Sequence, residues 1–518
     1  MYCSAAWRIR LASPAARKVL LVTLFPRIGR SPETTRHPAY TAEALRFATH
    51  PDVTIAERPF WPLLASWPVV ERSITPHLRQ APVAETTVEF LSTARVPTTI
   101  AAMGDRYHPH CRIDLWSDGL TLDETLPLLE GPILDAETNR LGAITALRVA
   151  DGSPANAALW PPGGQAITLE EFPDLPRDTF EHGKRQILFG PLQTALPAFQ
   201  IDTEGFQFYI ADAGGYTPPF QSVPSRVWVG ATEVAAKEWA ITTRETAATR
   251  MPYTHLQFLK KPAQDWGAGG VLVEGGMGYR PGNTFDFLLK DIGGFGFQPF
   301  AQAMTRTDPF WNMSVYQNTS GSVIEIVRDR LCRQIDLLMG FHLNRIECYR
   351  LLGPMPLVTM ALGSELRDRL AEQPGITNQD DIRNVIAVAY RRDPSRTSLT
   401  PVTNALLTVD EQSGGAIARH LTESQRLFGR RYIQLDAADL LTAEQAWSLG
   451  SLEALLLGLP HQRHAYSATW LDGMTTNLNW RARLVDEREG IDCPCRVIGQ
   501  RVLPSGPELI FQSEDLPG

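Results

Sequence analysis

The sequence predicts an α+β protein: a mixed, strand-rich N-terminal half with a glycine-rich hairpin, and a helix-rich C-terminal half. Three observations lead to this prediction. Between residues 105 and 235, apolar and aromatic residues recur at strand spacing, bounded by Gly and Pro. Residues 265–300 are rich in glycine and enclose two strand-like pieces. After residue 320, apolar residues recur at steps of three and four, which is the period of a helix.

The length predicts more than one domain, because a single domain usually has roughly 100–200 residues, and this chain has 518. We place the domains at 1–105, 106–315 and 316–518. The first is a Pro- and Ala-rich region. The second is a strand-rich domain that carries the nucleotide- and metal-binding element discussed below, and the third is helix-rich.

Frequent prolines exclude long helices from the first domain. The apolar segment 19–25 follows several basic residues, as in a signal peptide, but no small-residue cleavage site comes after it. We therefore expect a buried strand there, and a short helix at 41–48. In the second domain, strands are expected at 206–210, 226–229, 271–273 and 285–289, the last two forming the glycine-rich hairpin.

The third domain should begin with a long amphipathic helix. Apolar residues from Val323 to Tyr349 keep the helical period, charged residues occupy other faces, and Gly353-Pro354 ends the pattern. Further helices are expected at 357–372, 379–390, 415–427 and 442–457. The tail at 493–511 should form one or two strands.

Composition excludes several classes of partner. The net charge is −8 and no long run of Lys or Arg occurs, so we expect no nucleic-acid partner. No apolar run reaches the roughly 18–20 residues that would span a bilayer, so we expect no membrane partner. The six cysteines are sparse and irregularly spaced, which does not fit a disulfide framework. The only close pair, Cys493-Pro494-Cys495, lacks the second pair that a zinc site would need. We expect a soluble protein of the cytoplasm.

The glycine-rich hairpin contains the first candidate site. Mg²⁺ prefers carboxylate and amide oxygens, and Asn283 and Asp291 flank one predicted strand of the hairpin. Both could hold one metal ion between the phosphates of ATP, and the glycines after Asp291 would let the backbone approach a phosphate. The alternative is an ordinary glycine-rich turn followed by a surface Lys-Asp pair.

The second candidate site is the segment 104–112. His108 and His110 stand next to Cys111 and Arg112, and this group could supply metal ligands, phosphate contacts or acid–base groups. Zinc would need further ligands, and none is evident nearby. A surface loop after a strand is the alternative.

The two segments together resemble a known family, the aerobactin-type, NRPS-independent siderophore synthetases. Tyr107-His108-Pro109 with Arg112 resembles that family's Gly-x-x-Tyr-His-Pro-x-x-Lys element. Gly270–Glu274, then Asn283, then Lys290-Asp291, resembles its Gly-Ile-x-x-Glu-x-His-x-Gln-Asn element and later Arg/Lys-Asp. Pro281-Gly282-Asn283, followed by a predicted strand and Asp291-Ile292-Gly293, also resembles the metal-binding end of kinase-like phosphotransferases. The spacing from Glu274 to Asn283 is longer here, and Arg112 replaces a Lys.

The resemblance implies a function and a set of site residues. These enzymes adenylate a carboxylate and pass the acyl group to an amine or alcohol. Asn283 and Asp291 would hold Mg²⁺. The implied catalytic residues are His108, Arg112 and Lys290, and the residues implied to bind the nucleotide are Glu274, Asn283, Asp291 and either Arg250 or Arg244.

Three hypotheses follow. The first is an ATP- and Mg²⁺-dependent ligase or transferase of small-molecule biosynthesis, whose partner would be a small-molecule substrate. The second is a non-catalytic scaffold or partner-binding protein, because twelve Trp and several Pro-aromatic pairs could supply contact surface. The third is a metal enzyme, such as an oxygenase, that uses His108 and His110. The sequence leaves the oligomeric state open.

Overall fold

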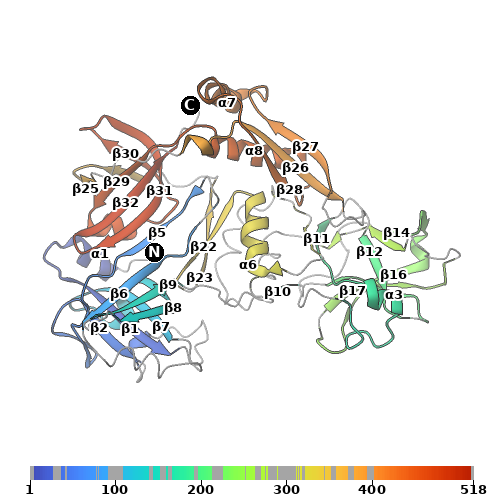
Figure 1. The fold of residues 1–518 in the computed structure, drawn as a ribbon, viewed down its shortest axis with the longest axis horizontal. Coiled ribbons are helices and arrows are strands. Elements are labelled where there is room, and N and C mark those ends of the chain that lie inside the picture. Colours follow the sequence, from blue (N-terminus) through green and yellow to red (C-terminus); the bar gives the residue numbers. More distant parts are fainter. Residues whose placement is uncertain are drawn as a thin grey trace. The chain divides into compact units, whose positions relative to one another are not determined.

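In the computed structural model, the chain folds into two compact units, and each unit is built from separate stretches of the sequence (Figure 1). The first unit contains Met1–Ala155, Leu337–Ile382 and Leu455–Gly518, and the second contains Asn156–Asp336 and Arg383–Ala454. The domains predicted at 1–105, 106–315 and 316–518 stay a prediction. The structure describes all residues except 1–4, 27–36, 41–43, 77–78, 80, 92–108, 139–143, 152–158, 161–165, 192–195, 203, 213–225, 251, 263–269, 275, 278–288, 290–310, 312, 314, 318–320, 344, 352–357, 371–377, 394–401 and 515–518.

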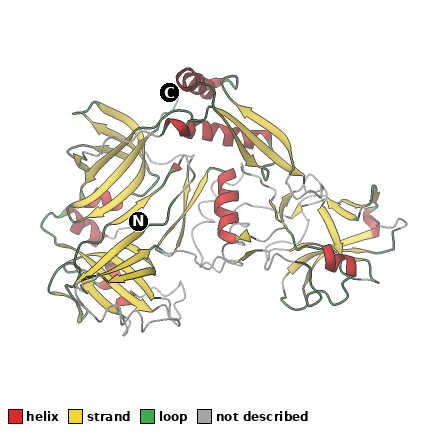
Figure 2. Cartoon of the chain, viewed as in Figure 1, coloured by secondary structure: helices red, strands yellow, loops and turns green. Residues whose placement is uncertain are grey.

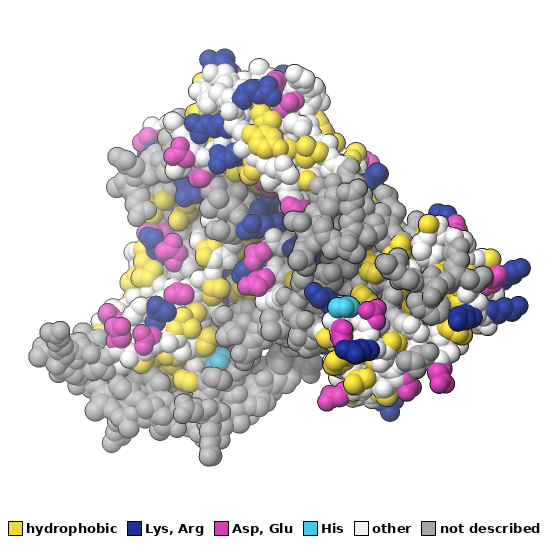
Figure 3. Space-filling model, turned by 45° about the vertical axis from the view of Figure 1, so that its right-hand side comes forward, with side chains coloured by type: hydrophobic (Ala, Val, Ile, Leu, Met, Phe, Trp, Pro, Cys, Tyr) yellow, Lys and Arg dark blue, Asp and Glu magenta, His cyan; other side chains and the backbone are white. Residues whose placement is uncertain are grey.

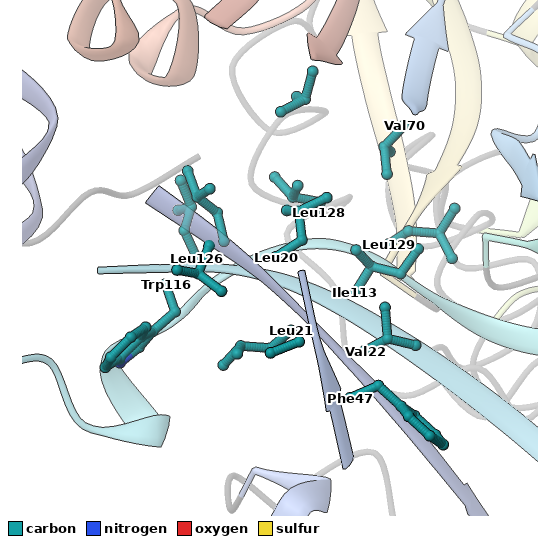
Figure 4. Packing of buried hydrophobic residues seen from close by; sticks show 14 of the residues in the cluster. Leu20, Leu21, Val22, Phe47, Val70, Ile113, Trp116, Leu126, Leu128 and Leu129 are labelled. Atoms are coloured by element: carbon teal, nitrogen blue, oxygen red, sulfur yellow. The ribbon is translucent and has the colours of Figure 1, made fainter. Parts of the chain in front are cut away.

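An antiparallel sheet in the order β2-β1-β7-β8-β9-β6 forms the first part of unit one. Its strands are β1 (Lys18–Pro26), β2 (Leu45–Ala48), β6 (Glu85–Leu91), β7 (Pro109–Ser117), β8 (Leu126–Thr138) and β9 (Ile144–Ala150). Side chains from β1, β7 and β8, among them Leu20, Ile113 and Leu128, form one buried cluster (Figure 4). The cluster stabilises the sheet because it removes this apolar surface from water.

The segment 61–65 bonds to both edge strands of this sheet. The Trp61 amide donates to the Arg46 carbonyl of β2 at 3.0 Å, and the Ala65 amide donates to the Glu89 carbonyl of β6 at 2.8 Å. Because the same short segment satisfies both edges, the sheet closes on itself and leaves neither edge open along this stretch.

A second, mostly antiparallel sheet of unit one has the order β24-β30-β31-β32-β29-β25, with β5 added beside β31. Its strands are β5 (Val70–Ser73), β24 (Val358–Ala361), β25 (Leu366–Arg369), β29 (Arg463–Ala468), β30 (Arg481–Asp486), β31 (Ile491–Leu503) and β32 (Gly506–Ser513). A tight turn at Gly363, whose φ is +88°, joins β24 to β25, and its amide donates to the Leu366 carbonyl at 2.8 Å. Helix α9 (Trp470–Thr475) starts at Thr469, whose hydroxyl accepts the Asp472 amide.

Unit one also contains α1 (Ala5–Ala12) and two small hairpins. One is β3 (Val53–Ile55) with β4 (Arg58–Phe60), and the other is β22 (Leu337–His342) with β23 (Arg345–Arg350). All six residues of β22 are buried.

Unit two contains a large, branched sheet in the order β15-β14-β18-β12-β13-β11-β19, with β17 beside β13, β16 beside β17, and β20 beside β11. Its strands are β11 (Ile187–Pro191), β12 (Leu196–Gln200), β13 (Gln207–Asp212), β14 (Arg226–Val229), β15 (Thr232–Val234), β16 (Trp239–Glu245), β17 (Pro252–Phe258), β18 (Val271–Glu274), β19 (Gly276–Met277) and β20 (Val315–Gln317). Phe208, Val227 and Leu256 belong to one apolar cluster of this sheet. Helix α3 (Arg177–His182) and the short pair β10 (Leu159–Trp160) and β21 (Gly321–Ser322) also belong to unit two.

A separate three-stranded sheet of unit two has the order β27-β26-β28. Its strands are β26 (Val385–Asp393), β27 (Val402–Val409) and β28 (Tyr432–Ala437), and its helices are α7 (Gly415–Phe428) and α8 (Ala443–Leu457). A Cβ atom on Gly450 of α8 would meet Val409 at 2.6 Å and Val388 at 3.3 Å. This close approach places α8 directly on the face of the sheet that carries those two valines.

The predicted fold class is wrong for the C-terminal half, where strands dominate (Figure 2). The long helix expected over 323–349 ends at Gln334, after α6 (Val323–Glu325) and the helical turns Ile326–Leu331 and Cys332–Gln334. The rest forms β22 and β23. Because β22 is buried on both faces, its apolar residues do not alternate with polar ones, and such a run fits a helical period as well as a strand.

Three other predicted helices are also strands. The segment 357–372 contains β24 and β25, the segment 379–390 contains a single turn at Gln379–Asp381 followed by β26, and the segment 41–48 contains β2. The helices predicted at 415–427 and 442–457 are confirmed as α7 and α8. The strands predicted at 19–25, 206–210 and 226–229 are confirmed within a residue or two as β1, β13 and β14. The prediction of one or two strands at 493–511 is confirmed by β31 and β32.

The first strand of the predicted glycine-rich hairpin is β18, which pairs with β14 and β12. Most of its predicted partner, at 285–289, lies outside the described residues. Within the part of the chain that is described, no helix combines the length and the apolar character needed to cross a membrane.

Candidate functional site

The structure describes three of the seven predicted site residues. Arg112 lies on β7 in unit one, while Glu274 ends β18 and Arg250 follows β16, both in unit two. His108, Asn283, Lys290 and Asp291 lie outside the described residues, as does the side chain of Glu274. The predicted roles of all seven stay predictions.

Arg112 forms the centre of a buried ion network. Its Nε and Nη2 donate to Asp114 at 2.9–3.0 Å, and its Nη1 donates to Glu130 on β8 at 3.1 Å. Asp114 also accepts from the Thr125 hydroxyl at 2.9 Å and from His37 Nε2 at 2.9 Å. All three nitrogens of the guanidinium therefore bind carboxylates of this chain.

His37 completes the network through both ring nitrogens. Its Nδ1 accepts the Ala39 amide at 3.1 Å, and its Nε2 donates to Asp114 at 2.9 Å. Burial would raise the pKa of Asp114, but Arg112 and His37 outweigh it and hold the pKa below its usual value. Because both ring nitrogens are engaged, His37 positions Asp114 and has no nitrogen left for acid–base work.

A second buried network, which the sequence analysis did not find, lies in unit two. Arg185 binds Asp212 through Nε at 3.0 Å and Nη2 at 2.7 Å, and binds Glu171 through Nη1 at 2.8 Å. The Thr249 hydroxyl donates to Glu171 at 3.3 Å and so attaches the segment before Arg250. No motif in the sequence marks Arg185, because its partners lie 14 and 27 residues away and meet it only in the fold.

Arg250 itself is exposed, and its backbone adopts the left-handed conformation, with a φ of +54°. Its Nη1 lies 3.6 Å from Glu245. Ion pairs of this exposed kind contribute little to stability.

Two further buried acids are paired in the same way. Asp439 of unit two accepts from Arg330 at 2.6–2.7 Å and from Gln334 at 2.7 Å. Asp151 of unit one accepts from His342 Nδ1 at 2.9 Å and from the Leu343 amide at 2.7 Å. These four networks use their charges to join segments of the fold. Among the described residues, no group of three or more His, Cys, Asp and Glu side chains could hold a metal ion.

The surface of the three-stranded sheet is different in character. Ala389 pairs with Leu406 on β27, and Val385 pairs with Tyr432 on β28, so these residues share the face opposite the two valines under α8. Leu406 is 59% exposed and Tyr432 is 57% exposed. We call this face, defined by Leu406, Thr408, Tyr432 and Gln434, the open face. Figure 3 shows one side of the molecule, on which hydrophobic side chains lie among charged ones.

The comparisons with known proteins do not assign this chain to a family. No family model matches it, and no curated protein matches it. A solved structure of a 43 kDa tail protein of prophage MuSo2 from Shewanella oneidensis is 9% identical, with a TM-score of 0.42 over 95% of this chain and 98% of that chain. A tail protein from Neisseria meningitidis is 8% identical, with a TM-score of 0.37 over 86% of this chain and 91% of that chain. A chain of the virion of a native gene transfer agent particle is 10% identical, with a TM-score of 0.39 over 65% of this chain and 85% of that chain.

These findings correct several predictions. The resemblance to siderophore synthetases is wrong, since the matching structures are tail proteins and a virion, and with it the prediction of a carboxylate-activating ligase of small-molecule biosynthesis. The expected small-molecule partner is wrong for the same reason, because the matching structures are those of tail proteins and of a virion. ATP and Mg²⁺ stay untested, and so does the cytoplasmic location. The TM-scores lie below 0.5, so this likeness does not assign the chain to a family.

Proposed function

We propose that this chain is a non-catalytic structural protein that assembles with other protein chains, and that the open face is one of its contact surfaces. The carrying observation is the exposure of Leu406 and Tyr432, 59% and 57%, on one face of a sheet whose other face α8 covers. Large side chains this exposed lose unfavourable contact with water when a partner covers them. Tyrosine in particular is frequent in the buried centre of interfaces.

The polar neighbours of these two residues support a protein partner. Thr408 and Gln434 are exposed on the same face and on the same two strands as Leu406 and Tyr432. In the register, Thr408 and Gln434 flank Ala387, in the row between that of Leu406 and that of Tyr432, and the exposed Asp436 shares the row of Leu406. Protein–protein interfaces combine apolar and polar contacts of this kind. By contrast, the buried charged side chains of the described networks already bind partners within this chain, so they join segments of the fold to one another.

The test uses the full chain isolated from the cells that encode it. We expect sedimentation velocity to give a particle larger than one 57.5 kDa chain, and native mass spectrometry to give a fixed stoichiometry of subunits. The double variant Leu406→Glu, Tyr432→Glu should sediment as the smaller species while keeping its thermal unfolding midpoint.

The matched control is Ile9→Glu, since Ile9 of α1 is exposed but belongs to unit one. That variant should assemble like the wild type. The proposal fails if the wild-type chain sediments as a monomer from its native source. The open face is not the contact surface if the double variant assembles as well as the control.

A further inference from the structure

We propose that Cys493 and Cys495 form a thiol–disulfide redox site in β31, closed by exchange with a small disulfide such as oxidised glutathione. The inference does not depend on the proposed assembly function. The carrying observation is the placement of the two thiols. They face the same side of one strand with their Sγ atoms 3.5 Å apart, and no disulfide joins them.

The register of β31 produces this placement. Cys493 pairs with Leu484 and Cys495 pairs with Ala482, both on β30, so the two cysteines are separated by two positions in a regular strand. Residues i and i+2 of a strand point to the same face. The strand rise of about 3.3 Å per residue puts their Cα atoms roughly 6.6 Å apart. Disulfides span about 4.4–6.8 Å between Cα atoms, so this pair lies near the upper limit.

Closing the disulfide brings the sulfur atoms from 3.5 Å to the bond length of about 2.05 Å, and the Cα separation of this pair lies within the range that allows it. Pro494, between the two cysteines, has no N–H to donate, and its carbonyl accepts the Glu514 amide at 2.9 Å. The neighbouring strand β32 ends at Ser513, opposite Cys495, so at Cys493 the ladder runs only to β30 within the described strands. A disulfide whose Cα separation lies near the upper limit carries strain and is reduced more readily, which makes the site reversible.

The two thiols differ in access, and this difference sets their order of reaction. Cys493 is partly exposed, whereas Cys495 is fully buried. The Cys493 thiolate attacks one sulfur of the small disulfide, forming a mixed disulfide and releasing one small thiol. The Cys495 thiolate then attacks Cys493 Sγ, forms the intramolecular bond and displaces the second small thiol. In balance, the protein loses two electrons and two protons, and one small disulfide becomes two small thiols.

A metal site is the other chemistry that a close cysteine pair could support. Two sulfur ligands supply half of the tetrahedral set that structural zinc requires, and no third metal-binding side chain joins them among the residues described here. The redox reaction needs only the two thiols that the strand already brings together.

The experiment is thiol exchange on the full chain. The protein is incubated with oxidised and reduced glutathione at a series of ratios, quenched by alkylation, and analysed by intact-mass and peptide mass spectrometry. We expect the wild type to lose two alkylatable thiols together, both in the peptide that contains Cys493 and Cys495. Excess reduced glutathione should restore both.

Single variants test the order of reaction. Cys495→Ser should accumulate a glutathione mixed disulfide on Cys493, because the resolving thiol is absent. Cys493→Ser should leave Cys495 reduced at the same ratios, because Cys495 is buried. Cys348→Ser is the matched control, since Cys348 is partly exposed but lies on β23, and it should behave like the wild type.

Circular dichroism spectra of the serine variants that match the wild-type spectrum will show that each variant is folded when its thiols are measured. The proposal is overturned if the wild type keeps both thiols at every ratio. It is also overturned if the wild type stops at a mixed disulfide, or if Cys495→Ser traps no glutathione.

Discussion

The two buried arginine networks have the same components and differ in their access to water. Arg185 in unit two and Arg112 in unit one each bind one aspartate through two nitrogens and one glutamate through the third. The Arg185 side chain is 2% exposed, whereas that of Arg112 is 17% exposed. Asp114 has His37 and Thr125 as additional donors. Burial raises the pKa of Asp212 despite Arg185, whereas Arg112 and His37 outweigh burial and lower the pKa of Asp114.

We expect the largest effect on the free energy of unfolding when the guanidinium of each network is removed. Arg185→Met leaves Asp212 and Glu171 buried without a countercharge, and breaking a buried ion pair in this way costs about 3–5 kcal/mol. Arg112→Met should cost clearly less, because water can reach Glu130 and because His37 and Thr125 still bind Asp114. Urea unfolding, with hydrogen exchange of β13 and β7 to separate the units, measures both. Equal losses in the two variants would show that solvent access does not distinguish the networks.

The pH dependence of the two units should have opposite signs. The pKa of Asp114 is lowered in the folded state, so its contribution to stability is present above the unfolded pKa of about 3.9 and is lost as pH falls through the lower, folded pKa. Burial outweighs Arg185 and raises the pKa of Asp212, so its contribution is greatest below the unfolded pKa and is lost as pH rises through the folded pKa.

Hydrogen exchange in β7 and β13 as a function of pH, in the wild type and in the variants Asp114→Asn and Asp212→Asn, measures this difference in pH dependence. In the wild type, acidification from pH 5 to pH 3 should increase hydrogen exchange in β7 before β13. An ion-paired carboxylate of this kind contributes about 2 kcal/mol at neutral pH. Asp114→Asn should flatten the acid dependence of unit one and leave that of unit two unchanged. If β13 opens first in acid, the assigned signs are wrong.

The smallest effect is expected for an exposed arginine with similar geometry. Arg226 binds Glu233 through Nε at 3.0 Å and Nη2 at 2.5 Å, but its side chain is 51% exposed. Water and salt screen such pairs, so Arg226→Ala should change the free energy of unfolding by less than about 1 kcal/mol. Differential scanning calorimetry at low and high salt measures this change. A loss as large as that of Arg185→Met would mean that geometry outweighs burial.

Local signals predicted the elements that carry their own boundaries. Helix α8 starts with a reciprocal cap, in which the Thr442 hydroxyl accepts the Gln445 amide and the Gln445 side chain accepts the Thr442 amide. Helix α7 ends at Gly429, whose φ is +72°. Both ends can be read from neighbouring residues, so the positions of these two helices could be predicted.

The candidate site could not be predicted in the same way. Arg112 was predicted to be a catalytic residue because of its neighbours along the chain, and that role stays a prediction. Its role as the centre of an ion network depends on Glu130 and His37, which β8 and the segment before Tyr40 bring to it. The open face depends on pairing between β26 and β28, which are separated by α7. Neither arrangement has a local sequence signature.

By itself, the sequence determined the capped helices α7 and α8, the buried strand β1 and the strands of the C-terminal tail. Their periods and end residues act over a few positions, so local energetics suffice. Only the tertiary structure decided that residues 337–350 form a hairpin. Asp151, 191 residues before His342, accepts hydrogen bonds from the His342 ring and the Leu343 amide at the turn. A strand buried on both faces gains its stability from such distant partners, and no local pattern of residues records them.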